Sequence, residues 1–258
     1  MFAIYKKEMR SYFINPIGYV YLGIFLALSA LVCCYTTLQS SSYETSTYFY
    51  CMIFAFVILI PLLTMRSFAE ERKMKTEQML LTAPVTITGM VMGKYLAAFT
   101  MFLGAVLISC INFIPLYAIA GEERAAVAET ANPVIGPQSA EIVGSIIGII
   151  LLGAAFIAIG IFISSLTENQ LSAAVSTIGI ILLMVILSLV NQIGSDEEGT
   201  RLISNYAIRF VIDWVCFVSR FAPFGAGQFD PSALLYYVSI TGIFLFLTVR
   251  VYDKRRWG

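Results

Sequence analysis

Histidine is absent from this sequence of 258 residues. Its absence excludes His-based acid–base catalysis, Ser–His triads and most zinc or copper sites. Charge is also scarce, because Asp, Glu, Lys and Arg make up 12% of the chain, against about 25% in an ordinary soluble domain. The 16 basic and 16 acidic residues balance, so the chain offers no basic face to nucleic acid and no nucleic-acid partner is expected.

Motifs for metals, disulfides and nucleotides are missing as well. The five cysteines are odd in number, form no CxxC pair and lie mostly in apolar runs, which indicates buried thiols. No GxxxxGK[ST] phosphate loop occurs, because Gly93-Lys94 has neither the upstream glycine nor the following hydroxyl. The chain is therefore expected to bind no cofactor or metal and to hydrolyse no ATP itself.

Apolar residues dominate what is present. They make up 59% of the chain, and the mean hydropathy is +0.85. A helix needs about 20 apolar residues to cross the hydrocarbon core, and six continuous stretches qualify. Their continuity predicts helices rather than the alternating strands of a barrel, and the first stretch is too long and too late for a signal peptide. The sequence predicts one all-α transmembrane domain over residues 1–258, with spans at 17–36, 48–65, 95–120, 142–166, 171–193 and 232–250.

The basic residues predict the orientation of these spans. With the N-terminus in the cytoplasm, twelve of the sixteen Lys and Arg residues lie inside, while most acidic residues lie outside. Six spans then bring the C-terminus back to the cytoplasm. The inside residues are Lys6, Lys7, Arg10, Arg66, Arg72, Lys73, Lys75, Lys94, Arg250, Lys254, Arg255 and Arg256.

The segment between the fifth and sixth spans is long and partly apolar. Residues 205–217 turn apolar again and carry Arg209 and Asp213 at a spacing that allows a pair on one helical face. Residues 205–227 are interpreted as a shallow or re-entrant helical segment in the outer leaflet, in preference to a buried seventh span. The alternative that they lie flat on the membrane stays open.

Ionisable groups are not expected at membrane depth. Proton- and sodium-coupled transporters normally place such groups there, so their absence argues against a self-powered transporter or a proton-shuttling enzyme. Gly144 and Gly148 form a GxxxG pair, which favours close packing within the chain over a subunit interface. Asn112 and Pro115 interrupt the third span, and a locally satisfied kink is favoured over a transport pathway.

The first thirteen residues have an amphipathic pattern. Phe2, Tyr5, Met9, Tyr12 and Phe13 recur at helical spacing, while Lys6, Lys7 and Arg10 face away. This pattern predicts a helix on the inner membrane surface before Pro16 turns the chain into the first span. An ordinary positively charged flank is the alternative interpretation.

The stretch between the second and third spans is the conspicuous cytoplasmic element. It is rich in helix formers, Glu71 and Lys75 are placed for an i,i+4 pair, and Pro84 ends it. Phe68, Met79 and Leu80 leave apolar side chains among the charges. The alternative is a solvated loop whose charges only follow the topology.

Three segments together resemble the permease subunits of type-2 ABC transporters, in the branch of the gliding-motility-associated and copper-site-maturation permeases. These are the N-terminal segment with Asn15-Pro16-Ile17-Gly18-Tyr19, the stretch from Arg66 to Lys94, and the string from Ser164 to Gln170. The resemblance implies a bacterial inner-membrane permease, an exporter of unknown substrate. It pairs with a second copy or a related permease and is driven by two cytoplasmic ATPase subunits that bind Mg-ATP.

The resemblance also implies roles for particular residues. Residues 68–80 would form the coupling helix that docks on the ATPase, and the turn at 167–170 would be a second contact. The N-terminal segment would be the interfacial helix on the membrane lipid, with Phe2, Tyr5, Lys6, Lys7, Met9 and Arg10. The residues expected at the ATPase are Phe68, Glu70, Glu71, Arg72, Lys75, Thr76, Glu77, Met79, Leu80, Glu168 and Asn169.

Two other functions remain as alternatives. In the first alternative, the chain belongs to this family but passes ATPase-driven motion to an extracytoplasmic partner instead of moving a solute. A membrane enzyme or channel outside the family would place converging polar groups at membrane depth, and the sequence offers only single hydroxyls and amides there. The uncharged spans slightly favour a lipid-like or amphipathic substrate.

Overall fold

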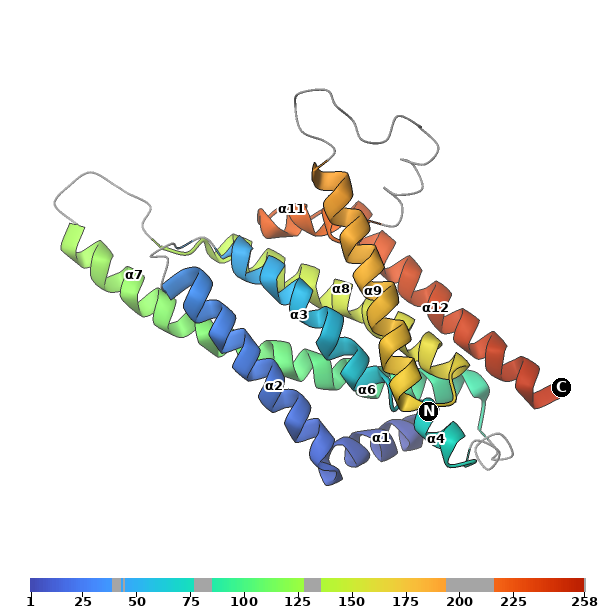
Figure 1. The fold of residues 1–258 in the computed structure, drawn as a ribbon. Helices are drawn as coiled ribbons and strands as arrows, with labels where there is room; N and C mark the ends of the chain where they lie inside the picture. The colour runs from blue at the N-terminus through green and yellow to red at the C-terminus, as the bar shows by residue number, and fades with distance from the viewer. Residues whose placement is uncertain (39–42, 44, 77–84, 128–135, 194–215, 258) are drawn as a thin grey trace.

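The computed structural model describes residues 1–38, 43, 45–76, 85–127, 136–193 and 216–257, and every element in these ranges is helical (Figure 1). Six of the helices are long and apolar enough to cross a membrane, which confirms the predicted all-α fold with six spans. The elements are α1 (Phe2–Ile14), α2 (Pro16–Cys33), η1 (Cys34–Leu38), α3 (Ser46–Thr64), α4 (Ala69–Lys73), α6 (Ile87–Ser109), η2 (Cys110–Phe113), α7 (Ile114–Val127), α8 (Ser139–Leu166), α9 (Gln170–Ile193), η3 (Ser219–Phe221), α11 (Ala222–Gly225) and α12 (Pro231–Trp257).

The third span begins earlier than the sequence predicts. Helix α6 starts at Ile87 instead of residue 95, and the Thr86 hydroxyl caps it by accepting a hydrogen bond from the Gly89 N–H at 3.2 Å. Lys94 therefore lies two turns inside the helix rather than in its flank. The prediction placed the boundary after Lys94 because a lysine at the end of an apolar run normally marks the membrane surface.

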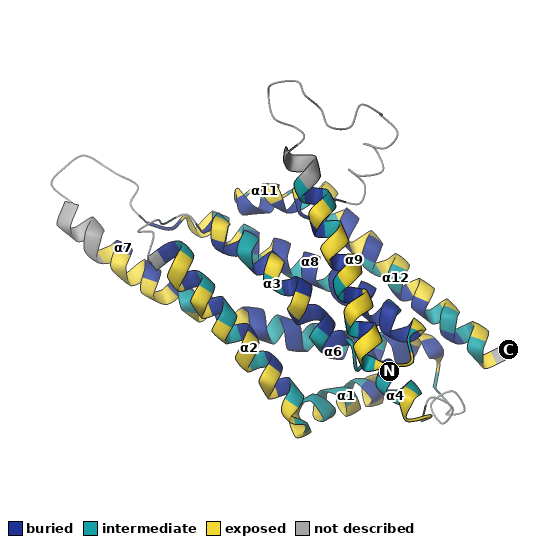
Figure 2. Ribbon diagram, in the orientation of Figure 1, coloured by how far each residue is buried: buried dark blue, intermediate teal, exposed yellow. Residues whose placement is uncertain are grey.

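Helix α8 is the centre of the bundle. It packs against α3, α6, α9 and α12, and Figure 2 shows much of it buried while α2 carries an exposed side. Close packing depends on glycines, because a Cβ at Gly153 would collide with the Phe102 ring and one at Gly160 would collide with Thr64. Phe102 and Phe156 are fully buried in the resulting core.

The Gly144–Gly148 pair is used inside the chain. Elements η3 and α11 pack across α8, and a Cβ at Gly144 would lie 2.7 Å from the Phe224 carbonyl oxygen. A Cβ at Gly148 would lie 2.9 Å from the Phe221 ring. Within the predicted re-entrant segment, η3 and α11 are the described helices, whereas the predicted pair of Arg209 and Asp213 lies outside the described residues.

The interruption of the third span is a short 3₁₀ turn, η2, which separates α6 from α7. The Asn112 amide donates a hydrogen bond to the Ser29 hydroxyl at 2.7 Å, and Ser29 is 2.9 Å from the Tyr48 hydroxyl. The Asn112 amide is thus satisfied by a side chain of a neighbouring span, which agrees with the interpretation of Asn112 as part of a locally satisfied kink.

Candidate functional site

The short helix α4 lies at the same end of the bundle as α1 and the C-terminal part of α12 (Figure 1). The backbone N–H groups at the start of α4 are paired by a side chain of α8. The Ser164 hydroxyl accepts hydrogen bonds from the N–H groups of Phe68 at 3.1 Å and Ala69 at 3.2 Å. The same hydroxyl donates to the Met65 carbonyl at 3.3 Å. A side chain almost a hundred positions away in sequence therefore supplies the cap that the local sequence lacks.

Phe68 lies inside the chain. It is 1% exposed, and its ring centroid is 4.7 Å from that of Tyr252 on α12. The expectation that Phe68 provides an apolar contact to an ATPase is therefore wrong. The reason is tertiary, because the partner that covers Phe68 comes from the last span and no local pattern indicates it.

The main electrostatic feature of this end is a cluster of four charges, called here the Lys94 cluster, formed by Lys7, Glu8, Glu71 and Lys94. The Lys94 Nζ is 3.0 Å from Oε1 of Glu8 and 3.0 Å from Oε1 of Glu71, and it donates to the Ser67 carbonyl at 2.6 Å. Lys7 is 3.3 Å from Glu71. Two positive and two negative formal charges thus join α1, α4 and α6.

Lys94 is 2% exposed, so its two ion pairs lie inside the protein, whereas the Lys7 side chain at the edge of the cluster is 60% exposed. Removing one partner of a buried pair leaves an uncompensated charge, which costs about 3–5 kcal/mol. Sequence reasoning counted Lys94 only as an inner flanking residue and missed this role. The available signal was a single lysine within an apolar run, with Glu8 and Glu71 predicted on the same side of the membrane.

The predicted pair of Glu71 with Lys75 is wrong. Helix α4 ends at Lys73, and Lys75 takes the left-handed conformation with φ 57. The Glu71 carboxylate pairs instead with Lys94, inside the Lys94 cluster. The Thr76 hydroxyl donates to the Glu71 carbonyl at 3.2 Å. The other predicted contact residues of this stretch, Glu77, Met79 and Leu80, lie outside the described residues.

Two arginines fix α4 further. Arg66 makes a bidentate pair with Glu70, with N···O distances of 2.6 and 2.7 Å. Arg72 reaches the other expected contact element, because it donates to the Leu166 carbonyl at 3.0 Å and lies 2.9 Å from the Glu168 carboxylate. The structure thus brings together α4 and the turn after α8, which the sequence placed separately.

A groove lies between α4 and the start of α9. It has a volume of about 700 Å³ and is lined by Met65, Lys73 and the segment from Asn169 to Ser172, with Val175 beyond it. Leu171 is 78% exposed and Val175 is 62% exposed. An exposed lysine beside exposed aliphatic side chains makes this groove the best candidate surface for a protein partner.

Helix α1 packs on the bundle through its tyrosines. The Tyr5 hydroxyl donates to Thr100 Oγ1 at 3.3 Å, and the Tyr12 hydroxyl donates to the Leu63 carbonyl at 3.3 Å. Burial raises the pKa of Tyr12 and the Glu8 carboxylate adds to this, so the phenol stays protonated as a donor. The residues of the predicted apolar face therefore have two environments. Tyr5 and Tyr12 contact the bundle, whereas Phe2 is 76% exposed and Phe13 is 44% exposed.

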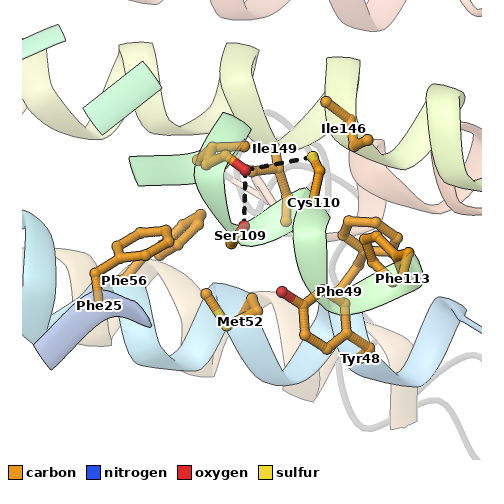
Figure 3. Close-up of a pocket in the computed structure, with 11 residues that line it drawn as sticks. Phe25, Tyr48, Phe49, Met52, Phe56, Ser109, Cys110, Phe113, Ile146 and Ile149 are labelled. Carbon is orange, nitrogen blue, oxygen red and sulfur yellow. Dashed lines mark hydrogen bonds between the residues drawn. The ribbon is translucent and has the colours of Figure 1, made fainter. Parts of the chain in front are cut away.

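A second cavity lies inside the bundle, between α2, α3, α6, η2 and α8 (Figure 3). Its aromatic walls include Tyr48, Phe49 and Phe113, and its volume is about 10 Å³, which is about the size of one water molecule. Ser109 and Cys110 both turn their side chains to the Val106 carbonyl, at 2.7 and 3.4 Å. This cavity is too small to hold a substrate.

Comparison with known proteins agrees with this arrangement. Residues 34–249 match the family described as ABC-2 family transporter protein, so the match covers α3, α8, α9 and most of α12. No curated protein matches the chain. The structure has six helices able to cross a membrane among its described residues, and the family match covers most of the sequence. In this family a separate subunit carries out ATP hydrolysis. The chain therefore belongs to the ABC-2 transporter family and is a membrane subunit without catalytic activity.

Proposed function

We propose that this chain is the permease subunit of an ABC exporter in a bacterial inner membrane, and that α4 and the turn at 167–170 form one docking surface for the cytoplasmic ATPase. The observation that carries the proposal is the contact of Arg72 with Leu166 and Glu168, because it joins the two expected contact elements into a single unit. The groove between Lys73 and Leu171 continues that surface.

The fixed position of α4 supports a role in transmitting motion. Helix α4 is held by Ser164 on α8, by Tyr252 on α12 and by the Lys94 cluster on α1 and α6. A partner that moves α4 therefore has to move or break contacts with four other helices. ATP binding then favours one arrangement of the spans through the differential affinity of the ATPase pair for that arrangement.

The partner assembly follows from the same proposal. Two copies of this chain, or this chain and a related permease, sit above two ATPase subunits, and Mg-ATP binds only to the ATPases. Both termini lie in the cytoplasm, in keeping with the excess of Lys and Arg on that side. The resemblance to the gliding-motility and copper-site-maturation branch, and the slight preference for an amphipathic substrate, belong to this proposal as well.

The docking surface is best tested at Lys73. Reversing Glu71 would disturb the buried Lys94 cluster and so confuse docking with folding, whereas Lys73 is exposed in the groove. The tagged chain is purified in mild detergent, and the retained ATPase is quantified by its activity. Lys73→Glu is expected to lower retention at least about tenfold, because a reversed charge at an interface brings like charges together.

Lys254→Glu is the matched control, since it makes the same charge change at an exposed position near the end of α12. It is expected to retain the ATPase. Equal retention by both variants and the unchanged chain would contradict the groove as the docking surface. Recovery of the unchanged chain without any ATPase would contradict the permease assignment itself.

A further inference from the structure

The outward side of α1 carries unpaired positive charge. Its one acidic residue, Glu8, is turned inward to Lys94, and Lys7 is engaged with Glu71. Lys6 and Arg10 are exposed, and among the described residues neither forms an ion pair. At 100° per residue these two side chains lie on the same side of the helix, one turn apart.

A hollow runs along this side of α1. Its volume is about 550 Å³, and it is lined by Lys6, Lys7 and Arg10 together with Ala3, Ser11, Ile14 and Asn15. The lining thus combines three cationic groups, an amide donor and small apolar surface. Lys and Arg donors converging on one hollow are the groups that recognise a phosphate.

Exposed apolar side chains border the same hollow. Phe2 is 76% exposed and Ile14 is 68% exposed. Phe13 packs edge-on against Tyr19 of α2 with ring centroids 6.0 Å apart, and Tyr19 is itself 60% exposed. The surface therefore passes directly from the cations of α1 to the outward face of a membrane-crossing helix.

We propose that this hollow binds an anionic phospholipid at the membrane surface. Lys6 and Arg10 contact the phosphate oxygens, and Phe13 and Tyr19 lie against the acyl chains. A phospholipid supplies both the negative charge and the apolar tail that this surface matches, whereas an acidic protein surface supplies only the charge. The inference requires that the chain spans a membrane with α1 at its surface, and it does not depend on docking of an ATPase.

Lipid bound to α1 can affect the rest of the molecule through the contacts that α1 makes. Lys6 and Arg10 are on the same short helix as Glu8, which holds Lys94. A lipid that steadies α1 therefore steadies the contact between α1, α4 and α6. The expected consequence is a more heat-stable protein in phosphatidylglycerol than in phosphatidylcholine.

Native mass spectrometry of the purified full-length chain tests the site, with phosphatidylglycerol and phosphatidylcholine added in equal amounts. The unchanged chain is expected to retain phosphatidylglycerol preferentially. The double variant Lys6→Gln/Arg10→Gln is expected to bind it about 30-fold more weakly, since each cation near the surface contributes about 1 kcal/mol. Added salt is expected to reduce the preference of the unchanged chain.

Two further variants separate a lipid site from general charge and from folding. Lys254→Gln/Arg256→Gln removes two exposed charges from the end of α12 and is expected to leave lipid binding unchanged. Lys6→Arg/Arg10→Lys keeps both charges and is expected to keep the preference. Equal retention of the two lipids, or undiminished binding by the glutamine variant, would overturn the proposal. Unchanged lipid binding with loss of a co-purifying ATPase would also overturn it and would assign the hollow to a protein partner.

Discussion

Lys94 carries one ammonium group between two carboxylates and a backbone carbonyl, at a position where water is almost excluded. Its partners belong to two segments that are distant in sequence, since Glu8 is 86 positions away. The Lys94 side chain on α6 therefore connects this helix to α1 and α4 through ion pairs. It also explains how α6 can start two turns before its lysine.

Replacing Lys94 by Met is expected to lower the free energy of unfolding by about 3–5 kcal/mol, because Glu8 and Glu71 lose their shared counter-charge. Thermal unfolding of the purified chain in detergent measures the change. The triple variant Lys94→Met/Glu8→Gln/Glu71→Gln is expected to recover part of the loss, because neither carboxylate is left beside a missing lysine and the remaining Lys7 is exposed to solvent. A Lys94→Met protein as stable as a Lys254→Met control would contradict this account.

Ser164 and its neighbour Ser165 provide a matched pair for the cap of α4. Both are fully buried, but the Ser164 hydroxyl accepts from the N–H groups of Phe68 and Ala69, whereas the Ser165 hydroxyl donates to the Phe162 carbonyl within its own helix. Ser164→Ala is expected to destabilise the protein by about 1–2 kcal/mol, because two buried N–H groups lose their acceptor.

Ser165→Ala is expected to change stability by less than about 0.5 kcal/mol, since its intrahelical bond adds little to a helix. The comparison is made by thermal unfolding, and ATPase stimulation in the reconstituted complex is measured beside it. Equal effects of the two alanine variants would show that the hydroxyl of Ser164 does not hold α4.

At the scale of elements, the stretch from Arg66 to Thr76 shows which features a local sequence pattern does not predict. The charge pattern predicted a helix with a Glu71–Lys75 pair, but α4 has only five residues and ends at Lys73. A helix that short is not stable alone, so its position depends on contacts from α8, α12 and the Lys94 cluster. Those contacts decide which way Glu71 points, and the local spacing does not contain them.

The packing of η3 and α11 on α8 gives a prediction at the same scale. Gly148→Ala places a methyl group against the Phe221 ring and is expected to destabilise the protein by about 1–3 kcal/mol. Gly104→Ala is the control, because a Cβ there meets no atom within 4 Å. The control is expected to stabilise α6 slightly through higher helix propensity, by up to about 1 kcal/mol. Thermal unfolding that ranks the two variants the other way would contradict the packing argument.

For the whole molecule, the described residues include six helices that are long and apolar enough to cross a membrane, and both termini lie at one end of the bundle (Figure 1). Six crossings would return the chain to the side on which it began. We expect that end to face the cytoplasm. In cells, a membrane-impermeant maleimide is expected to label Ser139→Cys from outside and Lys73→Cys only after permeabilisation. The unchanged chain with its five native cysteines is the background control. The reverse labelling pattern would contradict the topology.

The number and approximate position of the spans were determined by the sequence alone. Burial in lipid depends on the summed hydropathy of about 20 consecutive residues, and that sum is a local property. The role of Gly144 and Gly148 in packing within the chain, and of Asn112 as a kink, also followed from local patterns. The expected side of the membrane followed from counts of Lys and Arg, and it stays a prediction.

The tertiary structure decided which charges meet and which side chains stay available to a partner. Lys94 with Glu8 and Glu71, Phe68 with Tyr252, and Arg72 with Glu168 join segments from different helices. The energy of each contact depends on the distance and burial that the packed helices impose, and composition or periodicity within one segment carries no record of either. For that reason the sequence indicated which segment to propose as the contact with an ATPase, whereas the packing of the helices fixed the internal connections of that segment.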